Sequence, residues 1–308
     1  MSARHFLAVA AALVLLALLG RPSAAQDWKA EYPALTLAVV PVEGGDATIE
    51  RHKPLAAYLT RKLGVPVTLQ VMPDYAAVIA GQLAGTIHIA WYGPASYARA
   101  VLDGAKIQPL VTQRHDNGST GYYAVIYVLA TSPYRTIADL KGKTFALVDP
   151  NSTSGNEAPR FFLKQAGYDV DTFFGKVFFA GSHENAVLAL TQGTADAAAN
   201  YWTSETETMV TRMAAKGQLK KPDGMPMQQS DFRILFKSDF LPYGPFAVLA
   251  NMPLDLKAEI RDAFITLPND DKPAFDRLSD GRDTGFAAMK LTDYEPVIEM
   301  LRFNDHQH

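Results

Sequence analysis

The chain has 308 residues, of which 48% are hydrophobic and 20% are charged, and its formal net charge at pH 7 is −3. This composition is typical of a soluble globular protein with one large or two ordinary domains. It provides no strongly basic surface for nucleic acid, so any anion that the protein binds must be held by local dipoles and hydroxyl groups rather than by overall charge.

The N-terminal residues 1–25 predict an export signal. Arg4 precedes an unbroken apolar run, residues 6–19, and small residues form a cleavage site that ends at Ala25. The run is shorter than the roughly 20 residues that a membrane-spanning helix needs, and no later stretch is suitable. The mature chain is expected to begin near Gln26 and to diffuse freely in the periplasm, because it has no cysteine for a lipid anchor or a disulfide.

The first half of the mature chain alternates strand and helix signals. Apolar runs predict strands at residues 35–40, 65–71, 87–92 and 122–130. An amphipathic helix is predicted over residues 50–63, and Gly64 ends it. Asp74 is a favoured N-cap for a helix that begins with Tyr75, and Pro94 takes the favoured first position of the next helix.

The second half continues this alternation. Strands are predicted at residues 144–148, 176–180, 196–200, 232–236 and 247–250. Helices are predicted over residues 156–166 and 254–267, and Ser182 is the N-cap of another helix. Ser204 and Glu207 have the spacing of a capping box for a further helix. The remaining C-terminal residues are interpreted as helical and surface-exposed.

Strands that alternate with helices predict an α/β fold with mostly parallel sheets and helices on their faces. In such sheets ligands bind beyond the carboxyl ends of the strands, where several helix N-termini would point toward one cleft. The residues at these ends are rich in aromatic rings and hydroxyl groups and include one imidazole: Tyr75, Tyr92, Ser152, Thr153, Ser154, His183, Tyr201, Trp202 and Thr203.

One of these ends carries the strongest signal for a ligand. The segment Asp149-Pro150-Asn151-Ser152-Thr153-Ser154-Gly155 joins a predicted strand to a predicted helix and has no charge after its first residue. Hydroxyl groups and free backbone N–H groups at a helix start form a site for an anion. The partial positive charge there is worth about 0.3–1 kcal/mol for each such interaction.

Each of these residues also has an ordinary structural explanation. A single Ser or Thr at a helix start usually only caps the helix, although three in a row are more than a cap needs. A lone histidine such as His183 is usually a structural hydrogen-bonding group, and Tyr75 and Tyr92 could be core aromatics. Metal binding is not supported, because His115, His183 and the C-terminal histidines lack the spacing of metal ligands.

At these residues the sequence resembles the phosphonate/phosphite-binding proteins of bacterial ABC importers. The resemblance covers roughly residues 35–265, and the Asp-Pro-Asn-Ser-Thr-Ser-Gly segment is its most specific part. It also includes Pro73-Asp74-Tyr75, Trp91-Tyr92-Gly93, Gly121-Tyr122-Tyr123 and Gly181-Ser182-His183-Glu184-Asn185-Ala186.

The resemblance implies a two-lobed periplasmic binding protein of type II-like fold, with a hinge and a ligand cleft between the lobes. Lobe 1 would comprise residues 27–120 and 235–308, and lobe 2 would comprise residues 121–234. The resemblance assigns the phosphonate oxygens to Ser152, Thr153 and Ser154.

The resemblance also assigns Tyr75, Tyr92 and His183 as further ligands, and Tyr243, in a turn, is expected to line the cleft. Family members that bind aminoalkylphosphonates carry acids at two positions that align with Thr203 and Gly244, and Glu205 lies two residues beyond the first. We therefore expect a ligand without an ammonium group: phosphite, phosphate or a short alkylphosphonate such as methylphosphonate.

The expected function is that of a solute-binding protein: a monomer that passes its ligand to a membrane permease, without cofactor, metal or catalysis. One alternative is an exported phosphoesterase, for which Ser152 and His183 are the one conceivable nucleophile and base pair, without an evident carboxylate to orient the histidine. Another is a ligand-presenting partner of a sensor kinase, which would use the same site.

Overall fold

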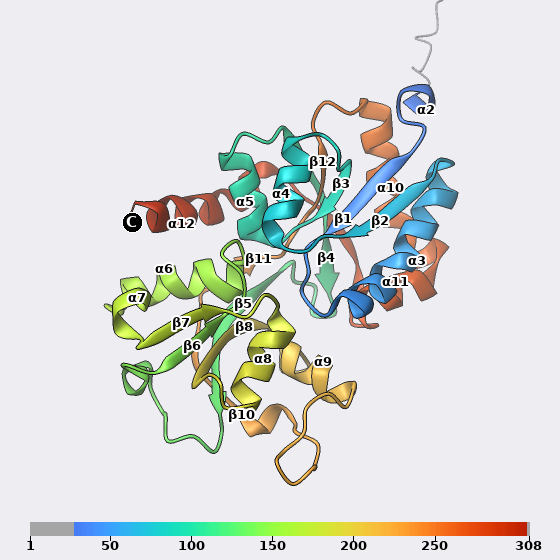
Figure 1. Ribbon diagram of the computed structural model, residues 1–308. Coiled ribbons are helices and arrows are strands. Elements are labelled where there is room, and N and C mark those ends of the chain that lie inside the picture. The colour runs from blue at the N-terminus through green and yellow to red at the C-terminus, as the bar shows by residue number, and fades with distance from the viewer. Residues whose placement is uncertain (1–27, 307–308) are drawn as a thin grey trace, which may run out of the picture.

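Two β-sheets organise the residues that the computed structural model describes, 28–306, and each sheet forms the centre of one lobe (Figure 1). The predicted export signal at residues 1–25 lies outside the described residues. Within residues 28–306, none of the helices combines the length and the apolar character needed to cross a membrane.

The first sheet has six strands. They lie in the order β13, β4, β12, β3, β1 and β2, formed by Asp283–Ala288, Ile107–His115, Phe246–Leu249, Ile89–Trp91, Leu35–Val39 and Val67–Val71. β1 pairs in parallel with β2 and β3, whereas β12 and β13 pair antiparallel with their neighbours. The sheet is therefore mixed, and the expectation of mostly parallel sheets is wrong.

Helices cover both faces of this sheet because its strands are apolar on both sides. Leu37 belongs to a buried cluster with side chains of α3 (Gly45–Leu63), α10 (Leu254–Asp270) and α11 (Lys272–Ser279). The next residue, Ala38, belongs to the opposite cluster, with side chains of α4 (Tyr75–Leu83) and α5 (Pro94–Leu102). The short helix α2 (Trp28–Glu31) precedes β1 and packs through Trp28 into the first of these clusters.

The second sheet is also mixed. Its main strands lie in the order β10, β5, β8, β6 and β7, formed by Phe232–Lys237, Gly121–Leu129, Ala197–Ser204, Thr144–Leu147 and Lys176–Phe179. Two short strands, β9 (Glu207–Thr208) and β11 (Leu241–Pro242), pair with β8 and β5. β6 is parallel to β7 and β8, and the other main pairs are antiparallel.

Helices again cover both faces. One face packs against α8 (His183–Thr191), α9 (Met209–Ala215) and α12 (Glu295–Asp305). The other packs against α7 (Val170–Phe173) and the 3-10 turn η1 (Ile137–Leu140). α6 (Ala158–Gln165) contributes Ala158 to the first cluster and Leu163 to the second. It continues from η2 (Thr153–Glu157), a single π-helical turn.

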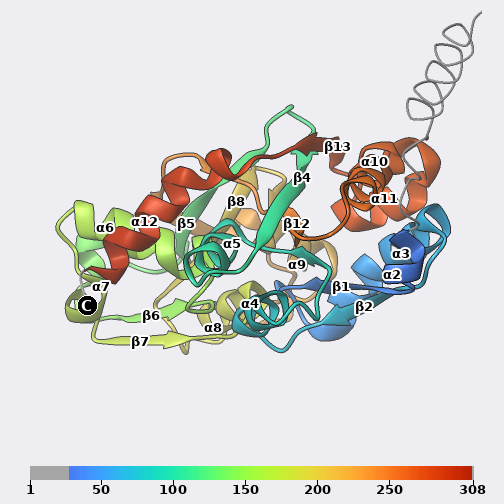
Figure 2. The ribbon, with the colours of Figure 1, turned by 90° about the horizontal axis from the view of Figure 1, so that it is seen from above.

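The chain crosses between the sheets more than once. It leaves the first sheet after β4, and it returns to it at β12 after β10 and β11. The boundary predicted between residues 234 and 235 falls inside β10, so the return lies after Lys237. α12 then lies beside both α5 and α6, at the junction of the lobes (Figures 1 and 2).

Two strands were missed, and one predicted helix cap was wrong. The strands Ile107–His115 and Asp283–Ala288 were not predicted, because their polar residues and Pro109 or Gly285 obscure the apolar pattern. Ser204 and Glu207 do not cap a helix: they close a tight β8–β9 turn, and Thr208 caps α9 by accepting from the Thr211 backbone N–H at 3.0 Å.

The C-terminal part is also not simply helical and exposed. Helix α12, which follows the 3-10 turn η4 (Leu291–Tyr294), buries one apolar face that includes Val297 and Leu301. A further 3-10 turn, η3 (Gln229–Asp231), lies earlier in the chain, directly before β10. Its burial follows from its position against both α5 and α6.

Candidate ligand-binding site

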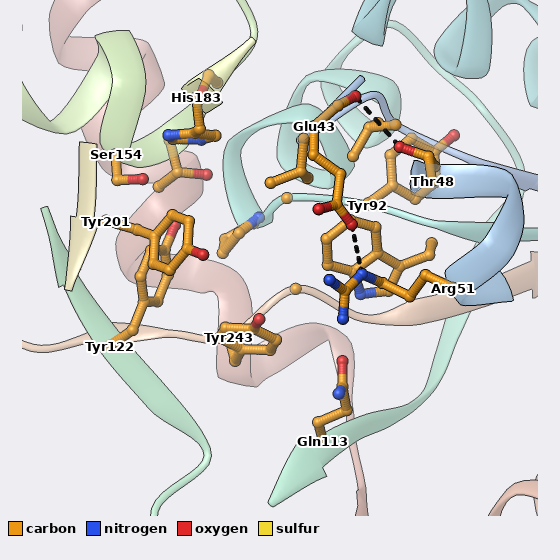
Figure 3. Close-up of a pocket in the computed structure, with 18 of the residues that line it drawn as sticks. Glu43, Thr48, Arg51, Tyr92, Gln113, Tyr122, Ser154, His183, Tyr201 and Tyr243 are labelled. Carbon is orange, nitrogen blue, oxygen red and sulfur yellow. Dashed lines mark hydrogen bonds and ion pairs between the residues drawn. The ribbon is translucent and has the colours of Figure 1, made fainter. Parts of the chain in front are cut away.

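A cavity lies between the two lobes, and side chains from both lobes line it (Figure 3). Seven of the eight predicted site residues are among its lining residues: Tyr75, Tyr92, Ser152, Thr153, Ser154, His183 and Tyr243. The eighth, Thr203, is not. The lining also includes residues that sequence reasoning did not assign to the site: Glu43, Thr48, Arg51, His52, Gln113, Tyr122, Glu207, Arg212 and Asp283.

The hydroxyl loop forms the start of η2. Ser152 is the N-cap, and its Oγ accepts a hydrogen bond from the Gly155 backbone N–H at 3.1 Å. A Cβ at Gly155 would lie 2.3 Å from the Cβ of Val148, so only glycine lets the loop pack against this residue, which directly follows β6. Ser152, Thr153 and Ser154 are each 2% exposed, which places three hydroxyl groups in a largely dehydrated helix start.

Buried tyrosines extend this set of hydroxyl groups. Tyr75, at the first position of α4, interacts through its side chain with Ser152, and Tyr122 of β5 interacts with Thr153 and Ser154. Burial raises the pKa of Tyr122 to about 12 and raises that of Tyr75 further. Both phenols are therefore protonated at neutral pH and can donate to an anion. Tyr92 lines the cavity, but its hydroxyl donates to the Val78 carbonyl at 3.4 Å.

His183 lies at the start of α8, after its N-cap Ser182, and forms part of the same wall. Its Nε2 is 3.4 Å from Ser152 Oγ, and its Nδ1 is 3.1 Å from Oδ1 of Asn200. Burial lowers the pKa of His183 to about 4, although the hydrogen bond from its Nδ1 to Asn200 Oδ1 acts to raise it, and the positive charge of Arg212 lowers the pKa further. The ring is therefore neutral at pH 7.

Charged side chains also line the cavity, and their presence was not predicted from the sequence. Arg51 of α3 forms an ion pair with Glu43 at 2.5 Å, and Arg212 of α9 pairs with Asp280 at 2.8 Å. Burial alone would raise the pKa of Glu43, but Arg51, Arg212 and Lys216 lower it to about 2. Figure 3 shows Glu43 and Arg51 across the cavity from His183, Tyr122 and Tyr201.

A third charged group lies between the lobes. His115 Nδ1 of β4 is 2.8 Å from Asp283 Oδ1 and 3.5 Å from Glu207 Oε2. Burial would lower the pKa of His115, but the two carboxylates raise it. The ligand atoms of these three residues lie within 4.8 Å of one another, so within residues 28–306 they form the group that could hold a metal ion. The spacing of His115 in the sequence gave no indication of this, because its partners are distant in the chain.

Of the two positions expected to lack an acid, Gly244 lines the cavity and Thr203 does not. A Cβ at Gly244 would lie 1.8 Å from the Tyr92 carbonyl oxygen, which excludes any side chain. Thr203 is buried in β8, Glu205 is exposed, and Glu207 is the residue of this segment that lines the cavity. Neither aligned position carries an acid, but three carboxylates from other positions, those of Glu43, Glu207 and Asp283, line the cavity.

Direct contacts hold the lobes together around the cavity. Thr153 Oγ1 accepts from the Ala95 backbone N–H of α5 at 2.8 Å, and the His183 backbone N–H donates to the Val42 carbonyl at 3.2 Å. Lys216 of α9 pairs with Glu43 at 2.8 Å. These bonds join residues of the first sheet's lobe to residues of the second, so the lobes are closed on each other.

Two mixed α/β lobes, connected by crossover segments and closed over a polar cavity, define a periplasmic solute-binding protein. The family model of the periplasmic substrate-binding proteins of phosphonate ABC transporters matches residues 37–294, and the chain belongs to this family.

Curated relatives agree with this assignment. The chain is 33% identical over 234 residues to the phosphate-import protein PhnD of Mycolicibacterium smegmatis, covering 71% of this chain and 72% of that protein. It is 28% identical over 280 residues to the phosphonates-binding periplasmic protein of Escherichia coli, covering 89% and 78%.

Solved structures share the fold. A binding protein component of an ABC phosphonate transporter from Pseudomonas aeruginosa aligns with a TM-score of 0.76 at 22% identity, over 89% of this chain and 87% of that one. PhnD1 of Prochlorococcus marinus, solved with methylphosphonate, aligns with a TM-score of 0.73 at 19% identity, over 89% and 98%. The predicted two-lobed α/β binding-protein fold is thus confirmed, and the relatives are transport receptors rather than enzymes.

Proposed function

We propose that the cavity binds a small phosphorus oxyanion, namely phosphite, phosphate or a short alkylphosphonate such as methylphosphonate, and that lobe closure presents it to a membrane permease. The hydroxyl groups of Ser152, Thr153 and Ser154, gathered with Tyr75 and Tyr122 at one helix start, carry this proposal. They supply uncharged donors to the several oxygens of such a ligand.

The number of donors is sufficient for useful affinity. Hydrogen bonds to a charged group contribute about 1.5–3 kcal/mol each, so four of them give roughly 6–12 kcal/mol. Micromolar binding requires about 8 kcal/mol. The contacts between the lobes form only when the lobes are closed. Ligand binding therefore stabilises the closed form, and the contacts of the closed form in turn increase the affinity for the ligand.

We expect the preferred ligand to lack an ammonium group, although carboxylates line the cavity. Glu43 already pairs with Arg51 and Lys216, and Asp283 pairs with His115, so these acids are neutralised by cations of the protein. Isothermal titration should give weaker binding for 2-aminoethylphosphonate than for methylphosphonate or phosphite. Tighter binding of 2-aminoethylphosphonate would overturn this order and would assign Glu207 or Asp283 to the ammonium group.

A hydrolytic role is not supported by the geometry of the one candidate pair. Ser152 Oγ and His183 Nε2 are 3.4 Å apart, but the group that orients the ring is the amide of Asn200 rather than a carboxylate. Incubation with p-nitrophenyl phosphate should give no turnover, whereas turnover would favour an exported phosphoesterase.

The remaining properties belong to the same proposal. The chain is exported and cleaved near Ala25, and it acts in the periplasm as a monomer whose lobes hinge at residues 116–120 and 238–245. Mass spectrometry of the mature protein tests the cleavage position, and light scattering after gel filtration tests the monomer.

A further inference from the structure

The tautomer of His183 is fixed by its neighbour Asn200. The Asn200 amide nitrogen donates to the His183 carbonyl oxygen at 2.9 Å, and its Oδ1 accepts from the Tyr201 backbone N–H at 3.0 Å. These two bonds allow only one orientation of the amide, because a carbonyl cannot donate and an N–H cannot accept. The atom that lies 3.1 Å from His183 Nδ1 is therefore an acceptor, so Nδ1 carries the proton.

The other ring nitrogen then has no proton. A neutral imidazole protonated at Nδ1 has a lone pair at Nε2 and can only accept there. In the ligand-free protein this nitrogen accepts from the Ser152 hydroxyl at 3.4 Å, so a ligand P–OH group that donates to Nε2 would replace Ser152 as its donor and free that hydroxyl for another ligand oxygen. His183 Nε2 is thus a hydrogen-bond acceptor in a part of the cavity where the neighbouring hydroxyl groups can donate.

The surroundings of His183 keep the ring neutral in the free protein. Tyr201 of β8 contacts the ring edge-on, with ring centroids 5.3 Å apart. The positive charge of Arg212 of α9 disfavours the protonated, positively charged form of the ring. Glu184, on its own helix, is directed to the Gly44 backbone N–H at 2.7 Å and to Gln218. The hydroxyl loop contributes Ser152 beside the ring, and this side chain carries no charge that could favour the imidazolium.

The other acids of the cavity are engaged elsewhere. Glu43, from the segment after β1, pairs with Arg51 and Lys216, while Glu207 and Asp283 face His115. No carboxylate among the described residues therefore pairs with the ring of His183, and burial dominates its titration.

We propose that the bound complex holds one proton between a ligand oxygen and His183 Nε2. A phosphorus oxyanion that enters as its monoanion brings this proton as a P–OH group, which donates to Nε2. A dianion instead takes up one proton from water or a buffer acid as it binds, and the proton is shared between the same two atoms. This inference rests on the proposed function and concerns the form of the ligand that the site accepts.

The consequence is a selection by protonation state. An oxyanion that has no proton to give at neutral pH, such as sulfate, would place a charged oxygen against the Nε2 lone pair. The methyl ester of methylphosphonate, a monoanion without a P–OH group, would do the same. His183 becomes a specificity-determining residue, and Asn200, which fixes the tautomer from outside the cavity, becomes a positioning residue.

Calorimetry measures this proton directly. Methylphosphonate is titrated into the mature protein in two buffers of different ionisation enthalpy, at a pH well above and a pH well below the second pKa of the ligand. We expect uptake of about one proton per ligand at the high pH and much less at the low pH. The affinity should fall about tenfold per pH unit above that pKa.

Two variants separate this role from a structural one. His183→Gln replaces the acceptor with an amide that can donate, so proton uptake should disappear and sulfate binding should increase. Asn200→Asp keeps Nδ1 protonated and favours the imidazolium, so uptake at high pH should decrease without loss of binding.

Tight binding by the unaltered protein without proton uptake at high pH would overturn this inference and leave the proposed function intact. Absence of binding of methylphosphonate, phosphite and phosphate at either pH would overturn both.

Discussion

The side-chain oxygen of Thr153 accepts a hydrogen bond from the backbone N–H of Ala95 at 2.8 Å, and these two residues belong to different lobes. Thr153 begins η2 in the lobe of the second sheet, and Ala95 lies in the first turn of α5 in the lobe of the first sheet. One hydroxyl group thus takes part in lobe contact and, in the proposed function, in anion binding. Its oxygen is the acceptor in the lobe contact, and the same side chain also interacts with Tyr122.

Replacement of Thr153 by leucine should abolish this dual role. The variant removes the contact with Ala95 and one hydrogen bond to the anion, each worth about 1–3 kcal/mol, and adds bulk to a position that is 2% exposed. We expect methylphosphonate affinity to fall at least 100-fold while circular dichroism stays unchanged. Thr153→Ser keeps the hydroxyl and should lose no more than about tenfold; equal affinity of the leucine variant and the parent would contradict the assignment.

Gly244 offers a test of the segment that returns to the first lobe. A Cβ at this position would lie 1.8 Å from the Tyr92 carbonyl oxygen, so Gly244→Ala must displace one of the two backbones. Overpacking of this kind costs about 1–3 kcal/mol, and urea unfolding should show it. Gly45→Ala is the matched control, because a Cβ there meets no atom within 4 Å. Similar unfolding midpoints for the two variants would show that the approach of Gly244 to Tyr92 is not tight.

The buried histidines predict how the stability of the ligand-free protein depends on pH. Burial lowers the pKa of His183 and of His52 from the ordinary 6.5 to about 4. The folded state therefore binds fewer protons than the unfolded state between these values. The associated stability is fully present above pH 6.5 and is lost as the pH falls through 4, by about 3 kcal/mol for each ring.

Urea unfolding at several pH values between 7.5 and 4 measures this loss. In His183→Gln the unfolding free energy should decrease less over this pH range than in the parent, by about 3 kcal/mol, which is the contribution of one histidine ring. His115, whose pKa is raised, contributes with the opposite sign in both proteins and cancels in the comparison. Parallel pH curves for the two proteins would refute a neutral, buried His183.

The sequence supported those parts of the site that depend on local signals. Ser182 and Asp74 cap α8 and α4 as expected, with the Asn185 and Ala77 backbone N–H groups as donors. The hydroxyl loop and Tyr75 lie beside the cavity because they stand where strands give way to helices. Such residues are predictable because their position relative to the strand end is a property of the nearby chain.

The charged side chains of the cavity were not predictable in the same way. Arg51 and Arg212 stand on amphipathic helices, where charged residues usually face water. Their partners Glu43 and Asp280 are brought to them by tertiary packing, and Asp280 sits at the left-handed C-cap of α11. Glu207 was masked by its resemblance to the end of a capping box, and β13, which carries Asp283, gave no clear strand signal.

Helix α12 contacts both lobes. It touches α5 on one side and α6 on the other, and its Asn304 donates to the Glu157 carbonyl at 3.0 Å while Arg99 of α5 pairs with Asp305. Helix α9, which lies away from α12 in Figure 1, contributes two ion pairs between the lobes, Lys216 with Glu43 and Arg212 with Asp280. We therefore expect the lobes to stay in contact along α12 and to separate at the side away from it, where the solute would enter and leave.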